Sequence, residues 1–235
     1  KILLINPSRW GRGITPIWIA SHSGILKDND FNVELFDCTF YKEWSLNETK
    51  INTEKKQYKP IDYESLIKYK SGLIEDLQKK IDEMKPQLVV WSAISSHIHG
   101  EGEYINFING LKLIEKIRLA KNTLCFTGGI ITTADPYGSL DISNNTLDGV
   151  FIGDSENTLL ELCISIRKKD FPQEIKGVIY NKKYKLNTIK PKRELLFKND
   201  YKYDYDIFEE QIFLRPYNGK VIKAIDYELS RGCPF

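Results

Sequence analysis

Glycine and small polar residues gather in the segments that follow the strands expected from this sequence. They are Asn6-Pro7-Ser8, Ser92 with Ser95, Gly128-Gly129, and Gly153 to Glu156. Glycine lets the backbone approach a ligand closely, and successive N–H groups can form a nest for an anion. The last of these runs also opens a predicted helix, whose dipole favours negative charge. Each loop alone is typical of ordinary turns and caps, but the four together indicate a ligand-binding edge.

The second chemically distinctive stretch is Ser230-Arg231-Gly232-Cys233-Pro234-Phe235, which follows a predicted strand. Thiolates such as that of Cys233 are the ligands that iron–sulfur clusters require. The other cysteines, Cys38, Cys125 and Cys163, are widely spaced and form no disulfide framework. We expect them to be buried, unreactive thiols, and this cysteine usage favours a reducing, cytoplasmic compartment.

Several common catalytic and nucleotide-binding motifs are missing from the sequence. Gly11-Arg12-Gly13 follows a strand, but no third glycine completes the dinucleotide fingerprint. There is no P-loop and no nucleophile elbow. His97 and His99 share a polar loop with Glu101 and Glu103, where histidines are more often solvated than bound to a metal.

Composition and charge narrow the range of partners. The 235 residues are 41% hydrophobic and 28% charged, which is typical of a globular protein. A formal net charge of +2 gives no electrostatic reason to expect nucleic acid as a partner. No apolar run approaches the ~20 residues that span a bilayer, so we expect no membrane partner either.

Strand and helix patterns alternate through residues 1–172. Continuous aliphatic runs such as Ile2 to Ile5 suit strands that are buried on both faces. The predicted strands cover residues 1–5, 32–37, 87–92, 123–127 and 148–152, and the clearest helical spacing covers residues 16–27, 63–84, 104–120 and 158–167. This alternation predicts a doubly wound α/β domain with a five-stranded parallel, flavodoxin-like (Rossmann-like) sheet in the order 2-1-3-4-5.

The pattern changes after residue 172. A hairpin is predicted from residues 175–180 and 183–187, with Asn181-Lys182 as its turn. An irregular linker follows over residues 188–219, and a last strand is predicted at residues 221–229. The predicted division of the chain is therefore 1–172, 173–220 and 221–235.

Five segments follow the pattern of one known family. They are Lys1 to Pro7, Lys85 to Ser92, Gly128 to Pro136, Asp148 to Leu159 and Arg231 to Phe235. Together they resemble the N-terminal cobalamin-binding domain of cobalamin-dependent radical S-adenosylmethionine enzymes. In that family an Arg-Gly-Cys-Pro-aromatic segment opens a loop whose three cysteines hold a 4Fe–4S cluster, with S-adenosylmethionine on the open iron. The resemblance implies that Cys233 is the first cluster ligand and that residues 221–235 begin the catalytic barrel, with the sequence ending there.

The resemblance also implies a cofactor site. The corrin would lie over the strand ends, and its nucleotide tail would run toward Gly128-Gly129 and Gly153 to Glu156. The implied cofactor-binding residues are Asn6, Pro7, Ser8, Asp37, Thr39, Ser92, Ser95, Gly128, Gly129, Ile130, Gly153, Asp154, Ser155 and Glu156. Thr39 stands where cobalamin mutases carry the histidine that ligates cobalt, so binding without a protein histidine is implied. Ile130-Ile131 and Ser155 depart from the family pattern.

The function that follows from the resemblance is methyl transfer with cobalamin, the cluster and S-adenosylmethionine. The substrate stays unidentified, because the barrel would select it. Two alternatives remain open at this point. One is a flavodoxin-like ligand-binding or regulatory module, for instance for a nucleotide. The other is a scaffold that has lost cobalamin, which the departures at Ile130, Ile131 and Ser155 allow.

Overall fold

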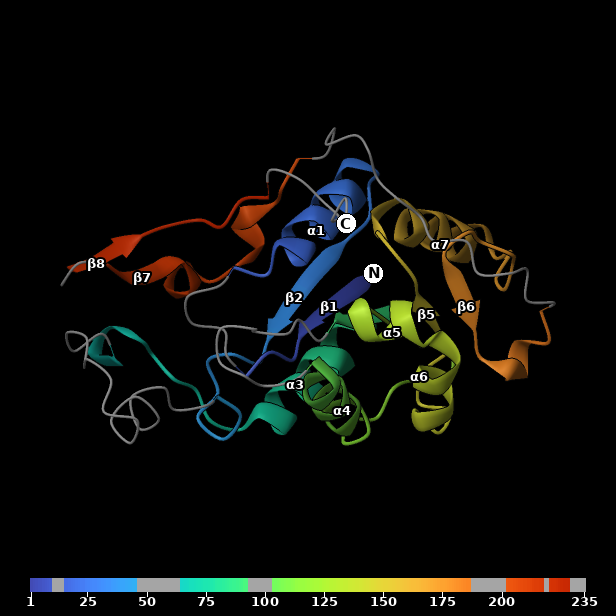
Figure 1. Cartoon of the computed structure of the whole chain (residues 1–235), viewed down its shortest axis with the longest axis horizontal. Helices are drawn as coiled ribbons and strands as arrows, with labels where there is room; N and C mark the ends of the chain where they lie inside the picture. Colours follow the sequence, from blue (N-terminus) through green and yellow to red (C-terminus); the bar gives the residue numbers. More distant parts are fainter. Residues whose placement is uncertain (10–14, 46–63, 93–102, 187–201, 218–219, 229–235) are drawn as a thin grey trace.

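A six-stranded sheet forms the centre of the computed structural model, which describes residues 1–9, 15–45, 64–92, 103–186, 202–217 and 220–228. The strands are β1 (Ile2–Asn6), β2 (Val33–Asp37), β3 (Leu88–Ser92), β4 (Leu124–Gly128), β5 (Gly149–Phe151) and β6 (Val178–Tyr180), in the order β2-β1-β3-β4-β5-β6. The first five run parallel, and β6 is antiparallel to β5 (Figure 1). The predicted flavodoxin-like fold and strand order are confirmed, with one strand more than expected.

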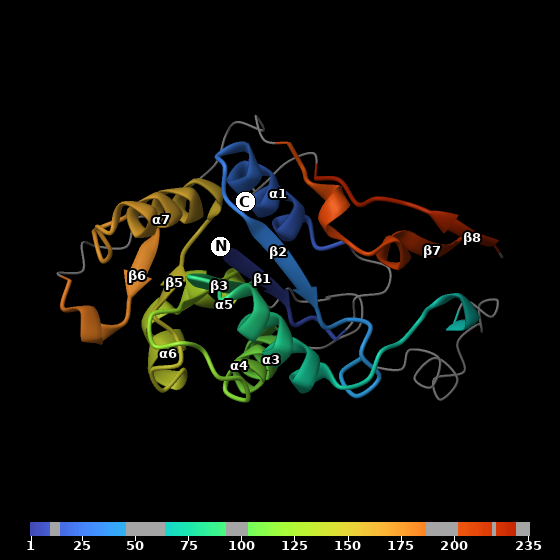
Figure 2. The same cartoon turned by 180° about the vertical axis from the view of Figure 1, so that it is seen from behind.

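Helices cover both faces of the sheet, as Figures 1 and 2 show. One face carries α1 (Ile17–Asp28) and α7 (Glu156–Lys168). The opposite face carries α3 (Leu73–Met84), α4 (Glu103–Ile114), α5 (Ile130–Ala134) and α6 (Pro136–Ile142). None of the helices in these described ranges is long and apolar enough to span a bilayer.

The uninterrupted apolar sequence of the central strands is explained by the helices on both faces of the sheet. Along β1, Ile2 and Leu4 pack into the core under α1 and α7, while Leu3 and Ile5 pack into the core under α3 and α4. Successive side chains of a strand point to opposite faces. A strand between two helical layers therefore needs apolar residues at every position, not at every second one.

The hairpin predicted at residues 175–187 is wrong. Its first half forms β6, which pairs with β5 so that Tyr180 lies opposite Gly149. In place of a second strand, Lys182–Tyr184 forms a 3₁₀ helix. Asn181 caps this helix by accepting a hydrogen bond from the Lys183 N–H at 3.0 Å, and its amide donates to the Leu147 carbonyl at 3.1 Å. Asn181 thus ends a strand at the sheet edge and does not form a hairpin turn.

The helix predicted over residues 63–84 begins only at Leu73. Lys70 forms a β-bridge with Tyr41, in which the Lys70 N–H donates to the Phe40 carbonyl at 2.7 Å. Gly72 then takes a left-handed conformation, with φ of 86°, as the N-cap of α3. Backbone pairing with a segment distant in sequence therefore overrides the helical spacing before Gly72.

A C-terminal arm, defined as the described residues of 202–228, lies along α1 and carries a small hairpin away from the sheet (Figure 1). Its elements are the 3₁₀ helices at Tyr205–Ile207 and Glu210–Phe213 and the antiparallel strands β7 (Leu214–Tyr217) and β8 (Lys220–Lys223). The last strand is therefore shorter than predicted, and the described part of the expected linker forms 3₁₀ helices and the strand β7. Phe208 and Ile212 are buried in the core on the α1 face.

Polar contacts attach this arm to α1. The Asp204 N–H donates to the Ala20 carbonyl at 3.0 Å, and the Asp204 carboxylate accepts from Ser23 at 2.5 Å. The same carboxylate pairs with Lys27 at 2.6 Å. Gly24 lies against the carbonyl of Lys202, where an added Cβ would clash with the oxygen.

We predict that Gly24→Ala destabilises the chain by about 1–3 kcal/mol, the range expected for overpacking a close contact. The new methyl group meets backbone that cannot rotate away, and this outweighs the gain of about 1 kcal/mol in helix propensity. Urea unfolding measures the difference. Gly128→Ala is the matched control, because its Cβ would meet only the Phe151 side chain, at 3.4 Å. Equal stability of the two variants would contradict the close contact between α1 and the arm.

Candidate functional site

The carboxyl ends of β3, β4 and β5 form one wall of a pocket of about 330 Å³. The opposite wall is the first part of α1, with Ile17, Trp18 and His22. Seven of the predicted site residues line this pocket: Ser92, Gly128, Gly129, Gly153, Asp154, Ser155 and Glu156. The fold therefore brings together these seven of the residues predicted after strands three, four and five.

The glycines of the pocket have specific backbone roles. Gly129 has φ of 130° and ψ of −169°, a region essentially confined to glycine, and Gly153 has φ of 74°. The Gly153 N–H already donates to the Thr133 hydroxyl at 3.0 Å. The Ser92 hydroxyl donates to the Gly128 carbonyl at 2.9 Å. These groups shape the wall of the pocket, and the Gly153 N–H is not available as part of an anion nest.

A histidine–serine pair joins the two walls. His22 Nδ1 lies 2.5 Å from the Trp18 carbonyl oxygen, and His22 Nε2 lies 2.8 Å from Ser155 Oγ. A carbonyl can only accept, so Nδ1 carries the proton and, in the neutral ring, Nε2 accepts from the Ser155 hydroxyl. Sequence reasoning missed Trp18 and His22. The signal was the polar run Ser21-His22-Ser23 inside an apolar helix, since all three residues are buried.

The indole of Trp18 adds an unused donor to this pocket. Its Nε1 is fully enclosed and has no hydrogen-bond partner among the described residues. An unsatisfied buried N–H costs about 1–3 kcal/mol, and a bound acceptor would remove this penalty. Because this N–H is enclosed, a ligand acceptor would reach it only if the side chains around it moved.

Acidic side chains dominate the charge of the lining. Asp154, Glu156 and Glu228 line the pocket, and no lysine or arginine does so among the described residues. The start of α7 contributes only about half a positive charge through its dipole. Each of these three carboxyl groups already has an interaction within the chain, and their further acceptor oxygens oppose a polyanion and favour a ligand with N–H donors. Glu228 was missed at the sequence level because it belongs to the arm, 72 residues after Glu156 in the chain.

A second cluster of predicted residues lies at the ends of β1 and β2, outside the lining of the pocket. Asn6 is opposite Asp37 in the sheet, and its amide donates to the Asp37 carboxylate at 3.0 Å and to the Thr39 hydroxyl at 3.3 Å. The Thr39 N–H donates to the same carboxylate at 3.0 Å. Thr39 is fully buried, so its hydroxyl faces Asn6 and not an open surface. Pro7 and Ser8 follow directly in the loop after β1.

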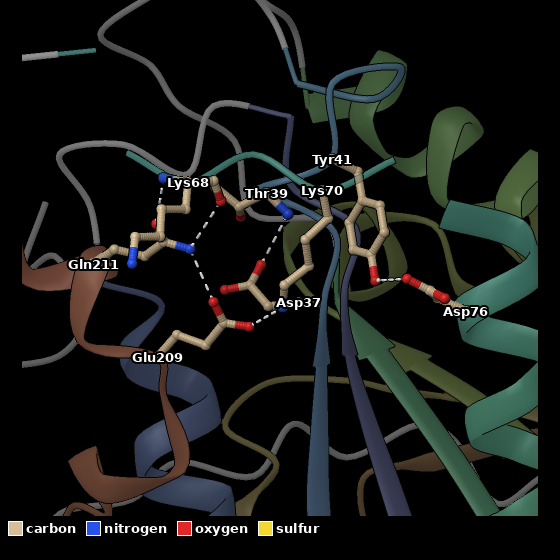
Figure 3. A network of polar contacts seen from close by, with 8 residues as sticks. All are labelled: Asp37, Thr39, Tyr41, Lys68, Lys70, Asp76, Glu209 and Gln211. Carbon is tan, nitrogen blue, oxygen red and sulfur yellow. Dashed lines mark hydrogen bonds and ion pairs between the residues drawn. The ribbon is translucent and has the colours of Figure 1, made fainter. Parts of the chain in front are cut away.

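The arm reaches the end of β2 as well, as Figure 3 shows. Lys70 forms an ion pair with Glu209, and the Lys68 N–H donates to the Gln211 side chain at 2.9 Å. Burial raises the pKa of the Asp37 carboxyl, and the hydrogen bonds from Thr39 and Asn6 act in the opposite direction. The residues predicted at β1 and β2 are thus held in a largely internal network.

The remaining predicted residues are separate from both clusters or outside the described residues. Ile130 is 58% exposed on α5 and does not line the pocket. Ser95, His97, His99 and Cys233 lie outside the described residues. Within the described ranges, no group of three or more His, Cys, Asp or Glu side chains could hold a metal ion.

The three other cysteines behave as the sequence predicts. Cys38, Cys125 and Cys163 are buried and unpaired. Burial raises the pKa of the Cys125 thiol to about 12, and it raises the pKa values of Cys38 and Cys163 as well. Thiols of this kind are unreactive near neutral pH.

We predict that Asp37→Asn changes how stability depends on pH. Because the folded-state pKa of Asp37 is raised, its contribution to stability falls as pH rises from the ordinary aspartate value of about 3.9 through the folded value. Asparagine does not titrate, and its oxygen can still accept both hydrogen bonds. The variant should therefore gain stability relative to the native chain between about pH 4 and about pH 7. Urea unfolding at the two pH values tests this.

The control for this experiment is Asp141→Asn, which removes an exposed acid paired with Lys182. Exposed pairs contribute about 0–1 kcal/mol, so this variant should differ little from the native chain at either pH. An Asp37→Asn difference that is the same at both pH values would show that the carboxyl titrates normally in the folded chain.

Comparison with known proteins finds similarity only at the level of structure. Neither a family model nor a curated protein sequence matches the chain. Among solved structures, one match is the radical S-adenosylmethionine methyltransferase TsrM from Kitasatospora setae with cobalamin and a 4Fe–4S cluster bound. It has a TM-score of 0.55 and 18% identity over 95% of this chain and 31% of that chain. TsrM with tryptophan substrate and a SAM analogue also matches, with a TM-score of 0.55 and 20% identity over 77% of this chain and 28% of that chain.

A second protein with the same fold is the cobalamin-dependent S-adenosylmethionine radical enzyme OxsB, with aqua-cobalamin and S-adenosylmethionine bound. The TM-score is 0.54 and the identity 16%, over 90% of this chain and 25% of that chain. The chain thus spans between a quarter and a third of the length of the structures it matches. At these identities the likeness shows a shared fold: the described part of this chain has an architecture also found in these radical S-adenosylmethionine enzymes.

Proposed function

We propose that this chain binds cobalamin and is the cobalamin-binding part of a radical S-adenosylmethionine enzyme that transfers a methyl group. The observation that carries the proposal is the chemistry of the pocket at the ends of β3, β4 and β5. It combines acidic side chains, a histidine–serine pair and an enclosed indole N–H. Cobalamin has a periphery rich in carboxamides, which offer N–H donors to carboxylates and oxygen acceptors to the indole. The shared fold with cobalamin-bound structures adds support.

The size of the pocket limits which part of the ligand it can take. At about 330 Å³ it lies at the small end of ligand pockets. It is large enough for one arm of a corrinoid but not for the macrocycle. In this proposal the nucleotide tail enters beside Gly128-Gly129 and Gly153 to Glu156, and Trp18 donates to an acceptor on it.

The macrocycle, in the same proposal, lies over the strand ends, where Ser92 and Ser95 contact the ring or its amides, with Pro7, Ser8 and Ile130 around it. Asn6, Asp37 and Thr39 belong to the proposed set as the buried network that supports this edge of the sheet. The Thr39 hydroxyl is buried against Asn6, which supports binding without a protein ligand to cobalt from this position.

The cofactor chemistry involves more than this pocket. Cobalamin, when bound, supplies methyl-group transfer, and the protein binds and shields it. Cys233 is proposed as a thiolate ligand of a 4Fe–4S cluster that would hold S-adenosylmethionine. The substrate is left open.

We predict that the purified 235-residue chain binds hydroxocobalamin at micromolar concentration and retains corrin absorbance through gel filtration. Flavin mononucleotide and ATP, added in the same way, should not be retained, because each brings at least about two negative charges to the acidic lining at neutral pH, against the single phosphodiester charge of the cobalamin tail. A chain that retains no corrin would overturn the proposal and leave the scaffold alternative. Retention of a nucleotide instead would support the flavodoxin-like alternative.

Two substitutions locate the site. Ser155→Trp places a large side chain in the lining of the pocket and should raise the Kd for hydroxocobalamin by about 10-fold or more. Glu161→Trp is the matched control, since Glu161 is an exposed residue of the same helix and is not part of the pocket. Equal effects of the two would place binding elsewhere.

We also predict that Trp18→Phe acts on binding and on stability in opposite directions. It removes a donor that has no acceptor in the free chain, so the free energy of unfolding should stay the same or rise. The same change should weaken cobalamin binding by about 5-fold, the value of one ordinary hydrogen bond. Titration and urea unfolding measure the two effects. A loss of stability without loss of affinity would assign Trp18 to packing alone.

A further inference from the structure

The C-terminal arm returns to the beginning of α1 at Asp226. The N-cap of α1 is Pro16, which provides no side-chain cap. Instead, the preceding Thr15 N–H donates to the Asp226 carboxylate at 2.5 Å. Thr15 is buried, whereas the Asp226 side chain is 40% exposed, so this contact between residues 211 positions apart lies at the surface end of α1.

Arg215 holds Asp226 in this place. Its Nη2 donates to the Asp226 carboxylate at 3.0 Å and to the Thr15 hydroxyl at 2.9 Å. Its Nη1 donates to the carbonyls of Ile212 and Leu214. The Arg215 side chain is only 11% exposed, and the Tyr205 hydroxyl holds the Asp226 carbonyl from another side at 2.8 Å. The guanidinium fork is therefore fixed by four acceptors, a geometry that lysine cannot reproduce.

Glu228 lies two residues beyond Asp226 and lines the pocket together with Trp18 and Asp154. The anchor at Asp226 restricts where the next residues can lie, because each residue extends the chain by at most ~3.6 Å. The same anchor holds Thr15, just before α1, but α1 itself is held by the burial of Ile19 to Leu26 in the core. Glu228 is therefore the pocket residue whose position depends on Arg215.

We propose that Arg215 is a positioning residue of the binding site: through Asp226 it places Glu228 at the pocket, where Glu228 accepts hydrogen bonds from amide N–H donors of the ligand. The identity of that ligand rests on the proposed function. The arm is then a part of the site and not a passive connection, and its hairpin strand β7 carries the residue that sets the geometry.

A double-mutant cycle with hydroxocobalamin tests this. Glu228→Gln should weaken binding by about 10-fold, the lower end for a hydrogen bond to a charged group. Arg215→Gln should weaken it by a similar factor. Because Arg215 acts through Glu228, the double variant should bind no more than about 2-fold worse than Glu228→Gln. Losses that multiply would overturn the proposal and assign Arg215 a general structural role.

Hydrogen exchange gives a readout that does not depend on the corrin. The Thr15 amide should exchange slowly in the native chain and faster in Arg215→Gln and in Asp226→Asn. Arg215→Lys should restore little of the protection or the affinity, since it lacks the fork. Unchanged Thr15 exchange in Arg215→Gln would overturn the anchoring step. If Arg215→Gln does not fold, Asp226→Asn replaces it in the cycle with the same expectation.

Lys223→Gln is the matched control. Lys223 belongs to the same hairpin, is 64% exposed and pairs only with the exposed Glu210 among the contacts described. It should leave the affinity and the Thr15 exchange unchanged. A native chain that binds no corrin would overturn the proposed function, and the recognition role of Glu228 with it. A native chain that binds while the losses multiply would overturn the role of Arg215 alone.

Discussion

The burial of α1 on every side is the constraint on which the rest of this structure depends. Eight consecutive residues, Ile19 to Leu26, are buried between the sheet, α7 and the C-terminal arm. A helix without a solvent face must give each polar side chain a partner. Ser23 forms a hydrogen bond with Asp204, and His22 forms one with Ser155. Gly24, which has no side chain, leaves space for the backbone carbonyl of Lys202. The pocket lies where the three structures around this helix meet.

Most of the fold could be predicted because its signals are local. Uninterrupted aliphatic runs mark strands buried on both faces, and their alternation with helices restricts the topology to a few arrangements. The wrong predictions concern segments whose secondary structure depends on pairing with a segment distant in sequence. Tyr180 pairs with Gly149 and not with the segment after Asn181, and Lys70 pairs with Tyr41 and so delays α3. Neither partner can be identified from the neighbouring sequence.

The candidate site likewise contains residues that could be predicted from the sequence and residues that could not. Residues at strand ends, such as Ser92 and Gly129, could be predicted because parallel strands bring their carboxyl ends to one edge. Trp18, His22 and Glu228 could not be predicted. Trp18 and His22 line the pocket because of the way α1 packs on the sheet, and Glu228 lines it because the arm returns to the domain. The sequence also could not separate Asn6 and Asp37, which are held in an internal network, from the residues that line open space.

The contact between Thr15 and Asp226 joins two segments that are synthesised far apart in time. Domains fold as units as they emerge from the ribosome, and local contacts form before distant ones. The sheet and its helices are complete in sequence by residue 180, yet one residue of the pocket lining, Glu228, belongs to the arm. A partly synthesised chain can therefore have the sheet and its helices before the lining of the pocket is complete.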